Sequence, residues 1–215
     1  TEGEPLRRGY FPNLEVIRRL AARHGLPFWN IVLSNAHFRY REPDAAGIRF
    51  QAFTTLAYGG QGLSYFTYFA PDSGNYRCAP VDQFGHRTPT WSYLQSVNLQ
   101  IARLAPTLLR LRSTHAYHLG EVPAGCSAAP DDAILGPDTG SEGARFLVGE
   151  FVHQDGSSYA MLVNKDLSNS ARFSIRPCGP ARRIERVSPY SGLCHDLAGE
   201  NDWLAPGQGV LLKLS

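Results

Sequence analysis

The sequence predicts a chain of mixed class over its 215 residues, with an α/β part followed by an all-β part. Two observations support this prediction. Helical and strand-like segments alternate before residue 115, which is typical of parallel sheets. After residue 116, short β-type runs are separated by turn clusters, which is typical of an antiparallel sandwich. We therefore expect one part over residues 1–115 and a second over residues 116–215.

The composition argues against several classes of protein. Hydrophobic residues make up 43% of the chain and charged residues 19%, a balance that indicates a folded protein rather than a disordered one. The formal net charge of +2 is too small to predict a nucleic-acid partner. Every apolar run is shorter than the ~20 residues that a membrane span requires. We expect neither a nucleic-acid partner nor a membrane.

The first predicted helix follows Pro12-Asn13 and ends at Gly25, a glycine stop signal. An apolar run from Pro27 to Ser34 comes next, and it suits a strand that is buried on both faces. The helix itself is predicted by an apolar stripe at helical spacing, formed by Leu14, Ile17, Leu20 and Ala21.

A second helix and a second strand repeat this pattern. Glu42-Pro43 opens the helix, with proline at its first position, and Gly59-Gly60 closes it. Glu42 and Asp44 are interpreted as acids that favour the positive end of the helix dipole. Gly62–Phe69 is then a second buried strand rich in aromatic residues.

A long loop over residues 70–87 leads to the third helix. Thr88-Pro89 is an N-cap followed by proline, and apolar residues at helical spacing continue to Leu108. Pro106 is expected to kink or shorten the end of this helix. A loop of this length inside a folded domain is more often functional than not.

The second part of the chain begins with a segment rich in Pro, Gly, Ala, Ser and Asp over residues 123–143, which predicts a loop. Met161 and Val163 in one run, and Phe173 and Ile175 in another, recur at every second residue, as in half-buried strands. The predicted strands are Arg145–His153, Ser158–Asn164, Ala171–Ile175, Arg182–Val187 and Gly209–Leu214.

The cysteines and the known catalytic motifs give no sign of a metal or a cofactor. Cys78, Cys126, Cys178 and Cys194 are too irregularly spaced for a CxxC metal site. Cys178 and Cys194 could form a disulfide bond or remain buried free thiols. The GxGxxG, Walker A, HExxH and GxSxG patterns do not occur in the sequence. We expect no metal and no cofactor.

Several segments of the first part together resemble a known family. They are Tyr10–Arg18, Pro27–Asn30, Arg49–Gly59 (RFQAFTTLAYG), Gly62–Tyr68 (GLSYFTY), Val97-Asn98 and Leu104–Leu108. These segments resemble the end of a glycoside hydrolase (β/α)8 barrel related to the family 42 β-galactosidases. The resemblance covers residues 10–112 well. The second part resembles the family only in being an all-β region that follows the barrel.

The resemblance implies a fold and a function. Pro27–Ser34 and Gly62–Phe69 would be strands 7 and 8 of the barrel, and an antiparallel β-sandwich domain would follow. The chain would belong to a glycosidase that acts on an oligo- or polysaccharide. The remaining barrel would come from an N-terminal part, a second chain or a homo-oligomer.

The expected catalytic glutamates of that family are not found in this chain. The family carries a nucleophile at the end of strand 7, but here the strand ends Val32-Leu33-Ser34-Asn35. Because glycoside hydrolysis normally uses two carboxyl groups, we expect the principal ones to lie outside this chain. Asp72 and Asp82, in the loop after strand 8, are weak catalytic candidates, and the alternative is that they form turns. The alternative is a non-catalytic carbohydrate-binding relative.

Substrate-binding residues are expected where the strands end, because active sites of these barrels lie at the carboxyl ends of the strands. Trp29 and Asn30, inside strand 7, are assigned instead to the barrel core. The predicted substrate-binding residues are Asn35, His37, Tyr68, Tyr76, Arg77 and His86.

Overall fold

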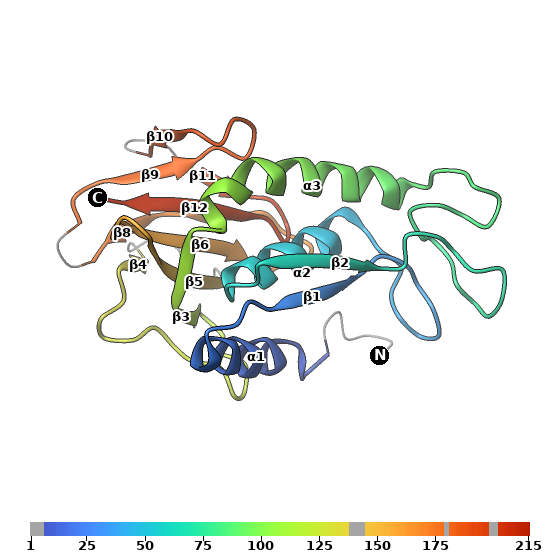
Figure 1. Cartoon of the computed structure of the whole chain (residues 1–215), viewed down its shortest axis with the longest axis horizontal. Helices are drawn as coiled ribbons and strands as arrows, with labels where there is room; N and C mark the ends of the chain where they lie inside the picture. Colours follow the sequence, from blue (N-terminus) through green and yellow to red (C-terminus); the bar gives the residue numbers. More distant parts are fainter. Residues whose placement is uncertain (1–6, 138–144, 179–180, 198–201) are drawn as a thin grey trace.

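The computed structural model describes residues 7–137, 145–178, 181–197 and 202–215. The fold is of mixed α/β class. A six-stranded antiparallel sheet makes up most of its β-structure, and the helices lie over one face of that sheet (Figure 1).

The first part contains one parallel β–α–β unit. Strand β1 (Trp29–Leu33) leads through helix α2 (Ala45–Ala57) to strand β2 (Gly62–Phe66), and the two strands pair in parallel from Trp29↔Gly62 to Leu33↔Phe66. Asp44 is the N-cap of α2, where its side chain accepts from the Gly47 amide. This unit agrees with the expected alternation of strand and helix.

Two further helices flank the parallel unit. Helix α1 (Tyr10–His24) ends at Gly25, which has a φ of 63° and lets the chain leave the helix. Helix α3 (Pro89–Leu108) begins with the side chain of its N-cap Thr88 accepting from the Thr90 amide. The helix continues through Pro106 and ends two residues later.

The six-stranded sheet has the strand order β10-β9-β12-β6-β5-β3. Neighbouring strands pair antiparallel throughout. Two short pairs, β4–β8 and β7–β11, lie outside it. The strands are β3 (Leu111–Leu119), β4 (Leu135–Pro137), β5 (Phe146–His153), β6 (Ser158–Asn164), β7 (Ala171–Phe173), β8 (Ile175–Pro177), β9 (Ile184–Val187), β10 (Cys194–Asp196), β11 (Asp202–Leu204) and β12 (Gly209–Leu214).

Helix α2 lies between the parallel strands and the six-stranded sheet. On one side Ile48 and Ala52 pack with Val32 of β1 and with residues of α3. On the other side Phe53 and Ala57 join a core with residues of the sheet. The sheet leaves room for the helix, because a Cβ on Gly149 of β5 would meet the Ala57 carbonyl oxygen at 1.9 Å.

The opposite face of the six-stranded sheet carries its own core. Alternate residues of the strands point there, such as Val148 of β5 and Leu162 of β6. Leu135, Phe173 and Leu204, from the short strand pairs, are buried in the same cluster. The sheet therefore has an apolar core on each face, and the prediction of half-buried strands was wrong for β6, which is buried on both faces.

The boundaries of several predicted elements were wrong. Helix α1 begins at Tyr10 rather than after Pro12, because proline is tolerated in a first helical turn. Pro43 precedes the N-cap of α2 instead of occupying its first position. The strands are shorter than the apolar runs that predicted them, since β1 covers Trp29–Leu33 and β2 covers Gly62–Phe66.

Strand β3 was not predicted, and it crosses the expected boundary between residues 115 and 116. Ala171–Ile175, predicted as one strand, is divided between β7 and the start of β8. The predicted loop over 123–143 contains β4, and residues 138–144 of it lie outside the described residues.

All four cysteines are free, so Cys178 and Cys194 form no disulfide bond here. Cys194 is exposed, which also differs from the expected buried thiol. Among the described residues, no helix is both long and apolar enough to cross a membrane.

Candidate functional site

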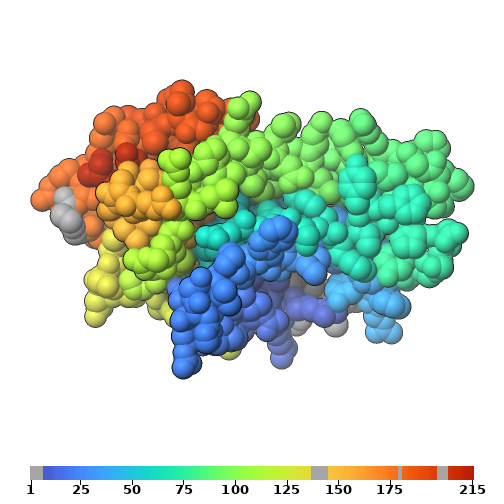
Figure 2. All heavy atoms as spheres, in the orientation of Figure 1, coloured from blue at the N-terminus to red at the C-terminus, as the bar shows by residue number. Residues whose placement is uncertain are grey.

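The candidate site lies where the two parallel strands end. The segment 34–44 follows β1 and the segment 67–88 follows β2, and together they form one end of the molecule in Figures 1 and 2. An isolated antiparallel bridge joins Ala36 to Arg77, with each amide donating to the other carbonyl at 2.9 Å. This bridge brings residues from both segments to one place.

His37 is the centre of an aromatic cluster at this bridge. Its imidazole is largely buried, with 9% of the residue exposed. The Tyr76 ring stacks on it at a centroid distance of 5.1 Å and an interplanar angle of 21°. Tyr40 and Phe66 pack at 4.7 and 5.4 Å from the same ring. We call His37, Tyr40, Phe66 and Tyr76 the His37 cluster.

A chain of hydrogen bonds fixes which nitrogen of His37 carries a proton. The Thr67 hydroxyl donates to the Phe69 carbonyl oxygen, and the Asn35 amide nitrogen donates to Thr67 Oγ1 at 3.2 Å. Asn35 Oδ1 is therefore an acceptor, and it lies 2.8 Å from His37 Nδ1. In the neutral imidazole the proton is on Nδ1, which leaves Nε2 as an acceptor.

Arg77 and Tyr68 lie outside this stacked group. The Arg77 guanidinium donates to the Glu42 carboxylate at 2.9 Å, which ties the two segments together a second time. Glu42 was interpreted as an acid at a helix start, but Asp44 alone caps α2. The Tyr68 hydroxyl accepts from the Trp91 indole at 3.2 Å. Figure 1 places both segments at the same end of the molecule.

Asp82 organises its own loop. Its carboxylate accepts from the His86 and Phe84 amides at 2.8 and 2.9 Å, and the His86 ring lies 3.5 Å away. The His86 amide and then the Phe84 amide hold the pKa of Asp82 below its usual range, against the opposing effect of desolvation. An ionised, amide-bonded carboxylate suits a turn better than a proton donor. Asp72 is exposed in a bend.

One face of the parallel strand pair is apolar and uncovered. Trp29 and Ile31 of β1 are 69% and 66% exposed, although Trp29 was expected in a core. The parallel register puts Phe66 on the same face, and the Trp29 ring lies so close to Gly62 that a Cβ there would meet it at 2.3 Å. The face is therefore uncovered at Trp29 and Ile31, whereas Phe66, at its end, packs against His37.

The free edge of β1 is also unusual. The Ser34 amide donates to the Phe66 carbonyl oxygen of β2. Because the backbone groups of successive strand residues point to opposite sides, the amide and carbonyl of Leu33 point away from β2. The Gln51 carboxamide of α2 accepts from the Leu33 amide at 2.8 Å and donates to its carbonyl at 3.2 Å. A side chain thus occupies the place where another strand could pair.

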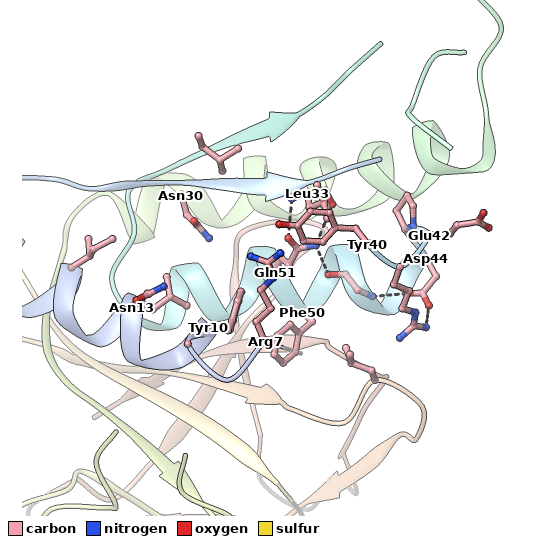
Figure 3. A pocket seen from close by; sticks show the side chains of 18 residues that line it. Arg7, Tyr10, Asn13, Asn30, Leu33, Tyr40, Glu42, Asp44, Phe50 and Gln51 are labelled. Atoms are coloured by element: carbon pink, nitrogen blue, oxygen red, sulfur yellow. Dashed lines mark hydrogen bonds and ion pairs between the residues drawn. The ribbon is translucent and has the colours of Figure 1, made fainter. Parts of the chain in front are cut away.

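A cavity of about 670 Å³ lies between this edge and the helices α1 and α2. Figure 3 shows Asn13 and Asn30 at one end and Glu42 and Asp44 at the other. Asn30 donates to Thr55 of α2 at 2.7 Å. The cavity is beside the His37 cluster rather than within it, and Tyr40 belongs to both.

The structure brings together some of the predicted residues and adds others. One group contains Asn35, His37 and Tyr76. The other three predicted residues have separate partners: Tyr68 contacts Trp91, Arg77 contacts Glu42, and His86 contacts Asp82. Tyr40 and Phe66 were missed as site residues, although aromatic residues beside strand ends were a usable signal. Among the described residues, no group of three or more His, Cys, Asp or Glu side chains could hold a metal ion.

Comparisons with known proteins give few matches. No protein family and no curated protein sequence matches this chain. One solved structure that it resembles is a GH27 β-L-arabinopyranosidase, Abp, from Geobacillus stearothermophilus, with 11% sequence identity and a TM-score of 0.44. The match covers 97% of this chain and 42% of that protein, so this chain spans less than half of its length. The likeness is too weak to carry an argument about this chain.

Proposed function

We propose that this chain is the C-terminal part of a glycoside hydrolase that cleaves O-glycosidic bonds in an oligo- or polysaccharide. In this proposal β1 and β2 are the last two strands of a (β/α)8 barrel. The principal catalytic carboxylates come from the remaining barrel, which is supplied by an N-terminal part, a second chain or a second copy. The antiparallel sheet is the domain that follows the barrel.

The uncovered apolar face of the parallel strands carries this proposal. Parallel sheets are almost always covered on both faces, and here α2 covers only one. The exposure of Trp29 and Ile31 supports the proposal that these side chains point into a larger barrel. In this proposal a neighbouring strand joins β1 at its free edge, beside the cavity, and replaces the Gln51 carboxamide that bonds the Leu33 backbone there.

The His37 cluster supports a carbohydrate ligand. A sugar presents apolar C–H groups on its ring faces and hydroxyls at its edge. The Tyr76 and Phe66 rings offer apolar surface, and His37 Nε2 offers an acceptor for a hydroxyl. In barrel enzymes, substrates bind at the carboxyl ends of the strands, where this cluster lies.

One observation favours the alternative, a barrel relative that binds carbohydrate without cleaving it. The acids at this end of the chain already have structural partners, since Glu42 pairs with Arg77 and Asp82 with backbone amides. Asn35, at the end of β1, offers an amide where a nucleophile would need a carboxylate. Asp72 remains the exposed acid in the segment after β2.

The test is hydrolysis of a panel of aryl glycosides and oligosaccharides by the complete protein that carries this chain. We expect turnover of at least one glycoside, with His37→Ala and Tyr76→Ala each lowering kcat/KM by roughly tenfold, the loss typical of one hydrogen bond or one ring contact. His195→Ala is the matched control, because His195 is exposed on β10 in the antiparallel part. Binding without turnover would support the alternative, and neither binding nor turnover would contradict both.

A further inference from the structure

Phe38 lies in a tight turn of the segment that follows β1, and its aromatic ring is exposed. The Tyr40 amide donates to the His37 carbonyl oxygen at 3.0 Å, which closes the turn. Phe38 is the first of the two residues at the centre of this turn, and it is 74% exposed. The proposed function does not use this ring.

The backbone of Phe38 has a conformation that suits glycine better than phenylalanine. Its φ of 50° lies in the left-handed region, which residues other than Gly, Asn and Asp rarely adopt. A first central turn residue with positive φ is most often one of those three. Backbone strain of this kind is concentrated at functional sites. A second non-glycine residue with positive φ, Cys78, follows Arg77 of the bridge between the two segments.

Asn75, from the segment after β2, holds this strained backbone in place. Its Oδ1 accepts from the Phe38 amide at 2.7 Å, and its Nδ2 donates to the Phe38 carbonyl oxygen at 3.3 Å. One carboxamide therefore bonds both backbone groups of Phe38, and it does so from the opposite segment. Because the backbone is fixed, the direction in which the Phe38 side chain leaves it is fixed as well.

The Phe38 ring is held beside the His37 cluster but at a different angle. Its centroid lies 5.4 Å from that of His37, and the two planes are inclined at 64°. The Tyr76 ring, in contrast, is inclined at only 21° to His37. The Phe38 and Tyr76 planes are therefore steeply inclined to each other. A sugar ring that lies flat on one of them cannot lie flat on the other, so the two rings suit two successive units of a saccharide.

We propose that Phe38 is a substrate-binding residue, whose ring stacks on the sugar unit next to the one that contacts the His37 cluster. The substrate class is an oligosaccharide of at least two units rather than a single sugar. This inference rests on the proposed function, because it takes the His37 cluster as the place of the first unit. The face of the ring offers apolar surface for the C–H groups of a sugar. Asn75 is the positioning residue for this ring.

The test measures how affinity depends on the length of the saccharide. The complete protein that carries this chain is screened on an array of mono-, di- and trisaccharides built from hexoses, pentoses and uronic acids. The affinities for the best trisaccharide and for its terminal monosaccharide are then measured by calorimetry. For a saccharide that is cleaved, the values of kcat/KM are compared instead. We expect the trisaccharide to be preferred roughly tenfold, the gain typical of one further aromatic contact.

Phe38→Gly separates a binding role from a structural one. We expect this variant to lose the preference for the trisaccharide and to keep the affinity for the monosaccharide. Its melting temperature should stay the same or rise, because glycine adopts the positive φ without strain. Tyr190→Ala is the matched control, since Tyr190 is 80% exposed in the turn after β9. The control should change neither affinity.

Two further variants test how the ring is held. Phe38→Tyr retains an aromatic ring and should retain the preference for the trisaccharide. Asn75→Ala removes both hydrogen bonds to the Phe38 backbone and should weaken the preference. In the Phe38→Gly background, Asn75→Ala should have no further effect on either affinity, because Asn75 acts through the position of the Phe38 ring.

The possible failures of this inference and of the proposed function are distinguishable. Equal affinity for the trisaccharide and the monosaccharide, or an unchanged preference in Phe38→Gly, would overturn the inference alone. A lower melting temperature or a changed native mass in Phe38→Gly, without a selective loss for the trisaccharide, would also overturn it. The ring would then support the fold or pack against another chain. If the complete protein binds no saccharide on the array, the proposed function fails and the inference fails with it.

Discussion

At the scale of single residues, the buried polar side chains allow the most specific predictions about stability. His118 and Glu150 are each almost completely buried, and each is held by defined partners. Burying a polar group is costly unless its hydrogen bonds are made, so the partners determine what a substitution does. Neither residue could be given partners from the sequence, because their partners come from distant elements.

His118 should make the folded protein sensitive to mild acid. The unfolded imidazole takes up a proton near pH 6.5, whereas burial and Lys165 lower the folded pKa to about 3. The unfolded state therefore binds more protons over this range, and stability falls as the pH falls from 6.5 toward 3. We expect a loss of about 3 kcal/mol between pH 7 and pH 4, measured by urea unfolding. In His118→Gln this part of the loss should disappear, and parallel curves for the two proteins would contradict the assignment.

Glu150 should tolerate an amide but not an apolar side chain. Its Oε1 accepts from the Tyr117 hydroxyl at 2.9 Å and from the Ile134 amide at 2.8 Å. Glu150→Gln retains an oxygen acceptor and should cost about 1 kcal/mol, whereas Glu150→Leu leaves the Ile134 amide unpaired and should cost about 3 kcal/mol. Chemical denaturation of both variants measures the difference, and equal costs would show that these hydrogen bonds contribute nothing to stability.

At the scale of elements, the close packing of α2 on the six-stranded sheet depends on Gly149. A Cβ at that position would lie 1.9 Å from the Ala57 carbonyl oxygen, so the helix or the strand must move to accept it. We expect Gly149→Ala to destabilise the fold by about 3 kcal/mol. Gly156→Ala is the control, because its φ is 88° but nothing lies within 4 Å, and it should cost about 1 kcal/mol. Thermal unfolding of the two variants makes the comparison, and similar losses in both would refute the packing argument.

The elements that could be predicted from sequence are those with local signals. Gly25 marks the end of α1 and Thr88 the start of α3, because each caps its helix through nearby backbone groups. Strand β3 could not be predicted, since its pairing with β5 shifts register between Ser113 and His115 and breaks the two-residue alternation. A local sequence pattern predicts only those structural features that residues close together in the sequence determine.

The candidate site could be predicted only in part, for the same reason. Asn35 and His37 follow a strand end, which is visible in the sequence, and their side chains bond each other. That Tyr76 stacks on His37 depends on the bridge between Ala36 and Arg77, which joins two distant loops. The exposure of Trp29 could not be foreseen, because burial depends on what lies opposite a strand.

At the scale of the whole molecule, the uncovered face of β1 and β2 should govern association. The double variant Trp29→Ser, Ile31→Thr removes exposed apolar area. We expect the free energy of unfolding to change by no more than about 0.5 kcal/mol. We also expect less self-association and less binding of a dye that recognises exposed apolar surface. Val32→Ala, on the covered face of the same strand, should cost about 2 kcal/mol. Sedimentation and urea unfolding test both statements. A large loss of stability from the surface pair would mean that this face is already covered in the free chain.

Helix α2 also bears on how chains of this kind can recombine. Its residues pack against the parallel strands on one side and against the six-stranded sheet on the other. A genetic crossover near residue 115 would cut β3 and would give Phe53 and Ala57 a foreign sheet to face. The foreign sheet of such a hybrid would need a residue without a side chain opposite the Ala57 carbonyl, as Gly149 is here. The two parts of the chain are therefore expected to be inherited together, and to diverge together, rather than to be exchanged as separate modules.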